Sequence, residues 1–150
     1  MKVLFDTCAA VDILGKSNWF FDAFCSYDAA LLRGFSPCLS VSSTTDICYL
    51  LHARGFATKK RARQLMANAL SLFELIDNMG TDCTKACVSD MPDYEDALIA
   101  YSAQRAGVDL IVTRNRKDFS HSPVAAITPE EFLRDYKPSD VEYAEVEFED

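Results

Sequence analysis

The chain has 150 residues, enough for one domain with a substantial core, and 49% of them are hydrophobic. Its formal net charge of −8 argues against a protein that coats nucleic acid with a basic surface, but not against an enzyme whose acids hold a metal. No apolar run reaches the roughly eighteen residues of a membrane span, and the start lacks the pattern of a secretion signal. We therefore expect a cytoplasmic protein without membrane contact.

The first half of the chain alternates short apolar runs with segments of helical spacing. Residues 2–5 predict a buried strand, and helices are expected over 8–14 and 18–33. A second strand follows near 37–41, and helices over 42–55 and 58–72 come next. The stretch "FELID" at 73–77 fits a third strand less clearly, because its apolar run is short.

The second half continues this alternation. A short helix is expected over 81–88 and a long one over 94–107, followed by a β-branched strand at 109–113. Residues 124–128 predict a last strand, and Pro129 begins a last helix. Alternating strands and helices predict a parallel sheet covered on both faces, a three-layer α/β/α sandwich. The domain is expected to span residues 1–138, and residues 139–150 form an acidic tail without Lys or Arg.

Acids and an amide from four segments are predicted to meet at one edge of this sheet. In an open parallel sheet, sites form at the carboxyl ends of the strands. Asp6 follows the first strand, and Asp46 lies in the first turns of the helix after the second. Asp96 lies in the first turn of the helix before the fourth strand, and Asn115 and Asp118 follow that strand.

Each of these acids also has an ordinary structural explanation. Asp6 is a suitable helix N-cap, and Asp46 suits the positive N-terminal end of a helix. Asp93 can cap the helix in which Asp96 lies three residues on, and Asp118 suits a turn. None of these explanations accounts for why the acids fall on the same edge.

Electrostatics favours a cation at this edge. Carboxylates a few ångströms apart repel by several kcal/mol unless protons or a cation neutralise them. Oxygen ligands without a nearby set of Cys or His residues select a hard ion such as Mg²⁺ or Mn²⁺. The substrate class that best fits such a site is a phosphodiester, which a metal-activated water can hydrolyse.

Four stretches of the chain resemble the PIN-domain ribonucleases, which include the VapC-type toxins of bacterial toxin–antitoxin pairs. These stretches are "VLFDTCAAVDIL", "SVSSTTDICYLL", "DYEDALIAYSAQRAGVDLIVTRNRKDF" and "ITPEEFL". The resemblance implies a sandwich of helices around a parallel sheet of about five strands. It also implies metal-dependent endonucleolytic cleavage of single-stranded RNA, an antitoxin protein as a partner, and a homodimer.

Carried over by position, the resemblance assigns roles to individual residues. Asp6 would be the first metal ligand and Asp96 the third acid, and Asp46 stands where the family usually has Glu. Asn115 and Asp118 remain alternatives for the last position near the metal or its water. The expected catalytic set is Asp6, Asp46, Asp96 and Asp118, and the expected metal ligands are Asp6, Asp96, Asp118 and Asn115.

Residues beside the acids are expected to contact the RNA or to stay outside the site. Thr113, Arg114, Arg116 and Lys117 are the candidates for substrate binding, although the three cations could equally be solvated. Glu95 is expected to point away from the cluster, because neighbouring helical residues face about 100° apart.

Two other functions remain open from the sequence. Cys8 stands where the family has Asn or Ser, and a thiol is a poorer hydrogen-bond partner. With the shorter Asp46, this leaves as an alternative a PIN-fold module that binds RNA or protein with weakened or lost catalysis. A phosphotransferase with Asp after its first strand fits worse, because "DTCAAVD" lacks the DxDxT arrangement.

Overall fold

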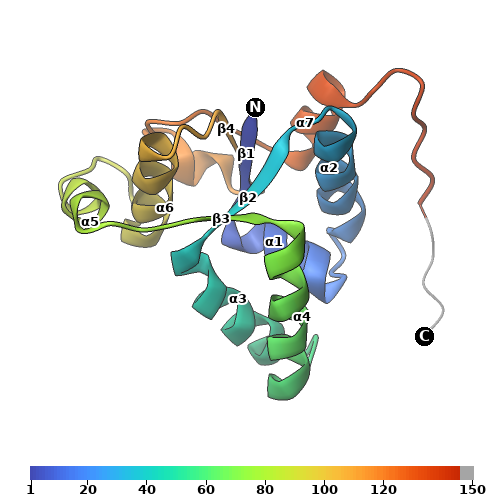
Figure 1. Ribbon diagram of the computed structural model, residues 1–150, viewed down its shortest axis with the longest axis horizontal. Helices are drawn as coiled ribbons and strands as arrows, with labels where there is room; N and C mark the ends of the chain where they lie inside the picture. The colour runs from blue at the N-terminus through green and yellow to red at the C-terminus, as the bar shows by residue number, and fades with distance from the viewer. Residues whose placement is uncertain (146–150) are drawn as a thin grey trace.

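Five short parallel strands form the centre of the molecule (Figure 1). The computed structural model describes residues 1–145. The strands are β1 (Lys2–Phe5), β2 (Ser36–Ser40), β3 (Glu74–Ile76), β4 (Leu110–Val112) and β5 (Ala126–Ile127). Their order is β3-β2-β1-β4-β5, and each strand runs parallel to its neighbours. The predicted parallel sheet is confirmed.

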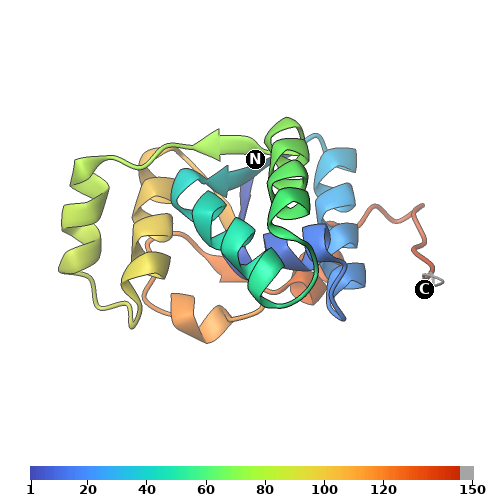
Figure 2. The same ribbon diagram turned by 90° about the horizontal axis from the view of Figure 1, so that it is seen from below.

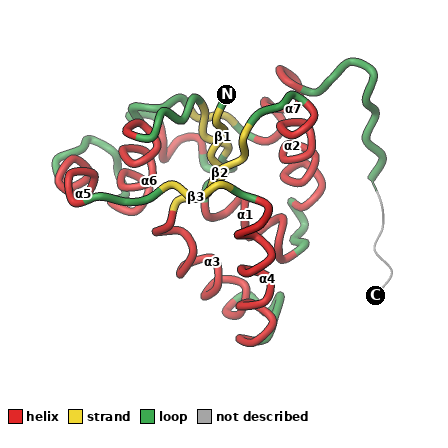
Figure 3. The backbone as a smooth tube through the Cα atoms, viewed as in Figure 1, coloured by secondary structure: helices red, strands yellow, loops and turns green. Residues whose placement is uncertain are grey.

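Helices cover both faces of this sheet, as the alternating pattern predicted (Figures 2 and 3). The helices are α1 (Thr7–Gly15), α2 (Phe20–Leu32), α3 (Val41–Ala53), α4 (Lys59–Leu72), α5 (Gly80–Cys87), α6 (Tyr94–Arg105) and α7 (Pro129–Tyr136). A short 3₁₀ helix, η1 (Arg116–Phe119), follows β4 and was not predicted. In Figure 1, α5 and α6 lie on one side of the sheet and α1, α2 and α4 on the other.

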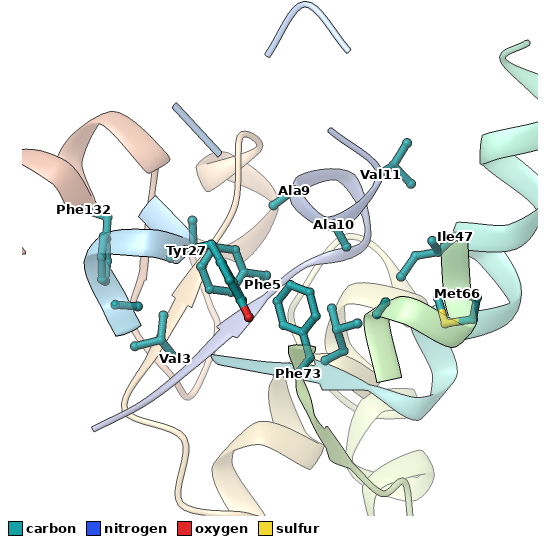
Figure 4. Close-up of a cluster of buried hydrophobic side chains, with 14 of the residues drawn as sticks. Val3, Phe5, Ala9, Ala10, Val11, Tyr27, Ile47, Met66, Phe73 and Phe132 are labelled. Carbon is teal, nitrogen blue, oxygen red and sulfur yellow. The ribbon is translucent and has the colours of Figure 1, made fainter. Parts of the chain in front are cut away.

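Alternating side chains of the central strand supply both halves of the core. Val3 and Phe5 point into the cluster formed with α1–α4 and α7, whereas Leu4 points into the cluster formed with α5 and α6. Figure 4 shows the first cluster, where the rings of Phe5, Tyr27 and Phe73 all contact one another; the Phe5 centroid lies 6.1 Å from that of Tyr27 and 5.7 Å from that of Phe73. Edge-to-face pairs of this kind favour one fixed packing of α2 and α4 on the sheet.

Several predicted elements are shorter in the structure than in the sequence pattern, and two of them show why. The helix expected over 18–33 begins at Phe20, because Ser17 forms a turn in which its Oγ accepts the Trp19 N–H at 3.1 Å. The strand expected over 124–128 is limited to Ala126–Ile127, since only these residues pair with β4 at the sheet edge.

The remaining expectations concern membrane spans and the tail. Within residues 1–145, no helix is both long and apolar enough to cross a membrane. Part of the tail contacts the domain, because the Tyr143 hydroxyl donates to the Asp28 carboxylate on α2 at 2.7 Å. Residues 146–150 lie outside the described residues, and the boundary at 138 remains a prediction.

Candidate active site at the carboxyl ends of β1 and β4

The strand β1 lies between β2 and β4, so the later strands are added on one side of β1 and then on the other. The order of the strands therefore reverses at β1. Phe5 pairs with Val112, so the residues that follow these two strands emerge side by side. The Asp6 N–H extends the ladder by donating to the Val112 carbonyl at 3.1 Å. This reversal point is where ligands bind in open parallel sheets, and Asp6 stands directly on it.

Asp6 is buried, with 4% of its surface exposed. Its Oδ1 accepts the Ala9 N–H at 2.9 Å and so caps α1, while its Oδ2 accepts a short hydrogen bond from the Thr113 hydroxyl. Burial raises the pKa of Asp6 to about 6, although these two hydrogen bonds lower it. Asp6 is therefore the N-cap of α1 and at the same time a buried acid with a raised pKa at the predicted site.

Asp96 lies in the first turn of α6, half-buried and facing other acids. Asp93 caps this helix by accepting the Asp96 N–H at 3.0 Å, so the Asp96 carboxylate is not the cap. Burial, followed by the negative charges of Asp93, Asp6, Asp118 and Glu95, raises the pKa of Asp96 to about 7. The structure thus brings Asp96 together with Asp6 and Asp118.

Asp46 meets Glu95 instead of joining this group directly. The two carboxyl groups lie within hydrogen-bonding range of one another, and Thr7 lies beside Glu95. Burial, the hydrogen bond to Asp46 and the neighbouring negative charges raise the pKa of Glu95 to about 7. The expectation that Glu95 points away is wrong: α6 lies beside α3, so the side chain next to Asp96 reaches across to Asp46.

The loop after β4 completes the edge. Asn115 is exposed, and its Nδ2 donates weakly to the Cys8 Sγ at 3.8 Å, which places Cys8 beside the site. Asp118 lies in η1, where its charge acts on Asp96. Both alternatives for the last position thus lie at the expected edge.

The expected substrate-binding residues differ in their surroundings. Thr113 is fully buried, and its hydroxyl donates to Asp6 and accepts the Asn115 N–H at 3.0 Å. Thr113 therefore faces Asp6 from inside the fold, and its contact with substrate stays a prediction. Arg116 pairs with Glu131 at 3.1 Å, and Lys117 is exposed.

Arg114 is held on two sides. Its Nε lies 2.8 Å from Asp12 Oδ2, although the N–H is not aligned for a hydrogen bond. Its guanidinium carbon lies 4.9 Å from the centroid of the Trp19 ring. Asp12, which is buried and also accepts the Ser17 hydroxyl at 2.7 Å, thus fixes a cation beside Asp6.

An open cleft runs along this loop. It has a volume of about 950 Å³ and is lined by residues of η1 and by the chain leading into β5, including Arg116, Lys117 and Asp118. Because Arg114 also lines it, the cleft places three cations and one of the acids along the same surface.

The donor set fits a hard divalent cation. Within residues 1–145, no three carboxylate, thiol or imidazole groups converge closely enough to coordinate one ion. Mg²⁺, however, is usually held by one or two carboxylates together with waters and substrate phosphates. Asp6 and Asp96 are two carboxylates of this kind, with pKa values raised chiefly by burial, and they stay the predicted ligands.

The sequence reasoning missed Glu95 and Asp12 as parts of this site. Asp12 follows Asp6 by six residues in "DTCAAVD", and the only signal was an acid within an otherwise apolar helix. A buried acid needs a partner, but no local pattern indicates that this partner is Arg114.

Comparisons with known proteins agree with this geometry. Residues 2–117 match the family described as the PIN domain. The fold is similar to VapBC2 from Rickettsia felis, solved with a DNA fragment from their promoter (TM-score 0.65, 17% identity, 85% of this chain and 98% of that chain). It is also similar to a toxin–antitoxin complex from Klebsiella pneumoniae (TM-score 0.59, 22% identity, coverage 85% and 97%).

A third solved structure with this fold is VapC20 from Mycobacterium tuberculosis, a sarcin-ricin loop cleaving toxin (TM-score 0.56, 13% identity, coverage 73% and 86%). No curated protein matches the sequence significantly. The structural similarities, all at low identity, show a common fold, and the sequence match spans most of the chain. The chain therefore belongs to the PIN domain family.

Proposed function

We propose that this protein is a metal-dependent endoribonuclease that cleaves single-stranded RNA. The observation that supports this most directly is the group formed by Asp6, Asp96 and Asp118 at the reversal point of the sheet. Burial raises the pKa values of two of these acids, Asp6 and Asp96, and the neighbouring carboxylates raise that of Asp96 further. Carboxyl groups perturbed in this way cluster at functional sites.

In this proposal Asp6 and Asp96 hold one or two Mg²⁺ or Mn²⁺ ions, with Asp118 or Asn115 beside them. When bound, the metal supplies Lewis acidity and neutralises charge on the phosphodiester during attack by water. Thr113 keeps the Asp6 carboxylate in one orientation through its hydrogen bond. Glu95, with a pKa of about 7 and its bond to Asp46, is suited to take up and release a proton near neutral pH.

The test is substitution of the two acids. Asp6→Asn or Asp96→Asn should lower Mg²⁺-dependent cleavage of an unstructured RNA by more than about 100-fold, because lost ligands cost more than lost supporting groups. The exposed Asp90→Asn is the matched control and should cleave normally. Thermal unfolding should show all three variants folded. Full activity in either site variant would reject the assignment.

A toxin role with an antitoxin partner belongs to the same proposal. Its support is the fold shared with toxin–antitoxin complexes, and it predicts that expression of the wild-type chain arrests growth while Asp6→Asn does not. We also propose a homodimer, which sedimentation of the purified chain would test; a monomer at all concentrations would contradict it.

A binding module without catalysis is the second candidate. The observation that favours it is the long contact from Asn115 to the Cys8 thiol, where an oxygen acceptor would bond more strongly. Cys8→Ser should then raise metal affinity or cleavage by about 10-fold or more. If Mn²⁺ calorimetry detects no binding at millimolar concentration in either protein, the binding module replaces the enzyme.

A further inference from the structure

A second cleft lies beside the acidic site, on the other side of Arg114. Its volume is about 420 Å³, and it lies where α1 ends at Gly15 and α3 ends at Ala53. The side chains that carry the argument are those of Asp12, Lys16, Trp19, Arg54, Phe56 and Arg114. Lys16, Trp19, Arg54 and Phe56 have no part in the proposed chemistry of the acids.

Two aromatic rings are presented to this cleft. Trp19 is 56% exposed, and Arg114 covers only one face of its ring, at 4.9 Å from the centroid. Phe56 is 38% exposed and lies directly against α1. A Cβ on Gly15 would stand 2.8 Å from the Phe56 ring, so glycine is required there by the close approach of that ring. The wall of the cleft is therefore built around a fixed aromatic surface.

The cleft is also basic, although the chain carries a net charge of −8. Asp12 compensates the charge of Arg114 through their ion pair. Lys16 and Arg54 are both exposed, and no carboxylate of residues 1–145 lies within ion-pair distance of Arg54. Two cations beside aromatic rings match the chemistry of a nucleotide, whose base stacks and whose phosphate is anionic.

The conformation of Lys16 is a further observation. It ends α1 with φ +49°, in the left-handed region where glycine is the usual residue. The chain thus keeps a lysine at a strained position at the rim of the cleft, although the glycine precedes it.

The cleft is joined to the acidic site through the backbone. Arg114, which lines it, directly follows Thr113, whose hydroxyl bonds to Asp6. A strand with its scissile phosphate at Asp6 can therefore place a neighbouring nucleotide over Arg114 and into the cleft.

We infer that this cleft binds one unpaired nucleotide of the RNA next to the scissile phosphate, with its base stacked on Trp19 and its phosphate held by Lys16 and Arg54. This inference rests on the proposed nuclease function and adds the path of the RNA strand next to the scissile phosphate. A base in a duplex has no free face to offer, so the cleft selects single-stranded RNA.

Trp19 is the only tryptophan of the chain, and its fluorescence reports stacking directly. The experiment titrates the wild-type protein in EDTA, where cleavage is blocked, with an unlabelled RNA hexamer that cannot pair with itself. Saturable quenching of Trp19 fluorescence is expected. A blunt RNA duplex of the same length should cause no quenching, although it carries more charge.

Variants separate stacking from charge. By anisotropy of a labelled hexamer, Trp19→Ala should weaken binding roughly 5- to 100-fold, and Trp19→Phe should restore most of it. Arg54→Ala should weaken binding and lower the slope of log affinity against log salt by about 0.7. Lys85→Ala removes the same charge on α5, at the far side of the molecule in Figure 1, and should change neither quantity.

Lys16→Gly gives the sharpest test. Glycine relieves the left-handed conformation, so thermal stability should stay the same or rise while RNA affinity falls. A loss of binding with intact stability cannot be a folding defect.

Hexamer binding without Trp19 quenching, or affinities unchanged in Trp19→Ala and Arg54→Ala, would overturn the inference. A second result would overturn the inference but leave the nuclease proposal intact. In it, the hexamer does not bind in EDTA, the wild type cleaves RNA with Mg²⁺, and these variants cleave with the same KM as the wild type. If RNA quenches Trp19 fluorescence but the protein does not cleave RNA, the proposed nuclease activity is rejected and the proposed nucleotide-binding cleft is supported.

Discussion

At the scale of single residues, the same carboxylate serves the helix and the site. A carboxylate has about four lone-pair positions on its two oxygens. Asp6 uses one for the Ala9 N–H and one for the Thr113 hydroxyl, so further positions remain for a ligand. Capping α1 therefore fixes the orientation of the Asp6 side chain and still leaves lone pairs of its carboxylate with which it can bind a cation.

Thr113 is the residue on which this arrangement depends. In Thr113→Val the side chain keeps nearly the same shape but loses its donor to Asp6, so we expect unfolding to become easier by about 1–3 kcal/mol. Because the Thr113 hydrogen bond lowers the pKa of Asp6, its loss should raise that pKa further. Carbon-13 NMR titration of the metal-free protein measures this directly.

Cleavage by Thr113→Val should fall by about 10–100-fold, as for other groups that orient a metal ligand. Thr113→Ser keeps the hydroxyl and is the control, with an Asp6 pKa near that of the wild type. An unchanged Asp6 pKa in Thr113→Val would show that the hydroxyl does not stabilise the carboxylate.

At the scale of elements, helix α3 depends on a distant residue for its cap. Its N-cap residue Ser40 makes no capping bond, because its hydroxyl is paired with that of Ser42 at 2.8 Å. Asn78, in the loop after β3, supplies the missing acceptor to the Ser42 N–H at 2.8 Å. Its amide also donates to Ser40 and Ser102, which ties α3 to α6. These are the two helices that carry Asp46 and Glu95.

Asn78→Ala should therefore loosen the junction between α3 and α6. We expect the free energy of unfolding to fall by about 1–3 kcal/mol, because polar groups that were paired lose their partner. Hydrogen exchange should speed up in the first turn of α3 specifically. The exposed Asn68→Ala on α4 is the control. Equal exchange rates in both variants would show that Asn78 has no capping role.

At the scale of the whole molecule, the acidic group couples global stability to pH. The pKa values of Asp6, Glu95 and Asp96 are raised to about 6, 7 and 7, above the roughly 4 of unfolded acids. Between about pH 4 and pH 7 the folded chain thus binds more protons than the unfolded chain, and stability falls as pH rises through that range.

In EDTA, the melting temperature should therefore be higher at pH 5 than at pH 8. Asp96→Asn should reduce this difference, and Asp90→Asn should not. Mn²⁺ at pH 8 should restore stability, because a ligand that binds only the folded state stabilises it. A metal-free protein that is most stable at pH 8 would contradict the packing of these acids in one site.

The fold was predictable because each element carries its own periodicity. The central strand "KVLF" and the helix that begins within "PDYEDAL" were expected within two residues of their observed bounds. Asp6 was expected at this edge because it follows a strand, and Asp96 because a helix that leads back into a parallel strand begins at the same edge. Helix η1 was not expected, since its four residues are too few to show a period.

The sequence by itself determined the order of the elements, the parallel sheet and the edge at which Asp6, Asp96, Asn115 and Asp118 gather, because these follow from local spacing and from the direction of strands. Only the tertiary structure decided that Glu95 bonds to Asp46, that Asp12 holds Arg114, and that Trp19 and Arg54 border one cleft. These contacts join residues on different elements. Their existence depends on how the elements cross and turn against one another, which long-range packing sets and which no local pattern records.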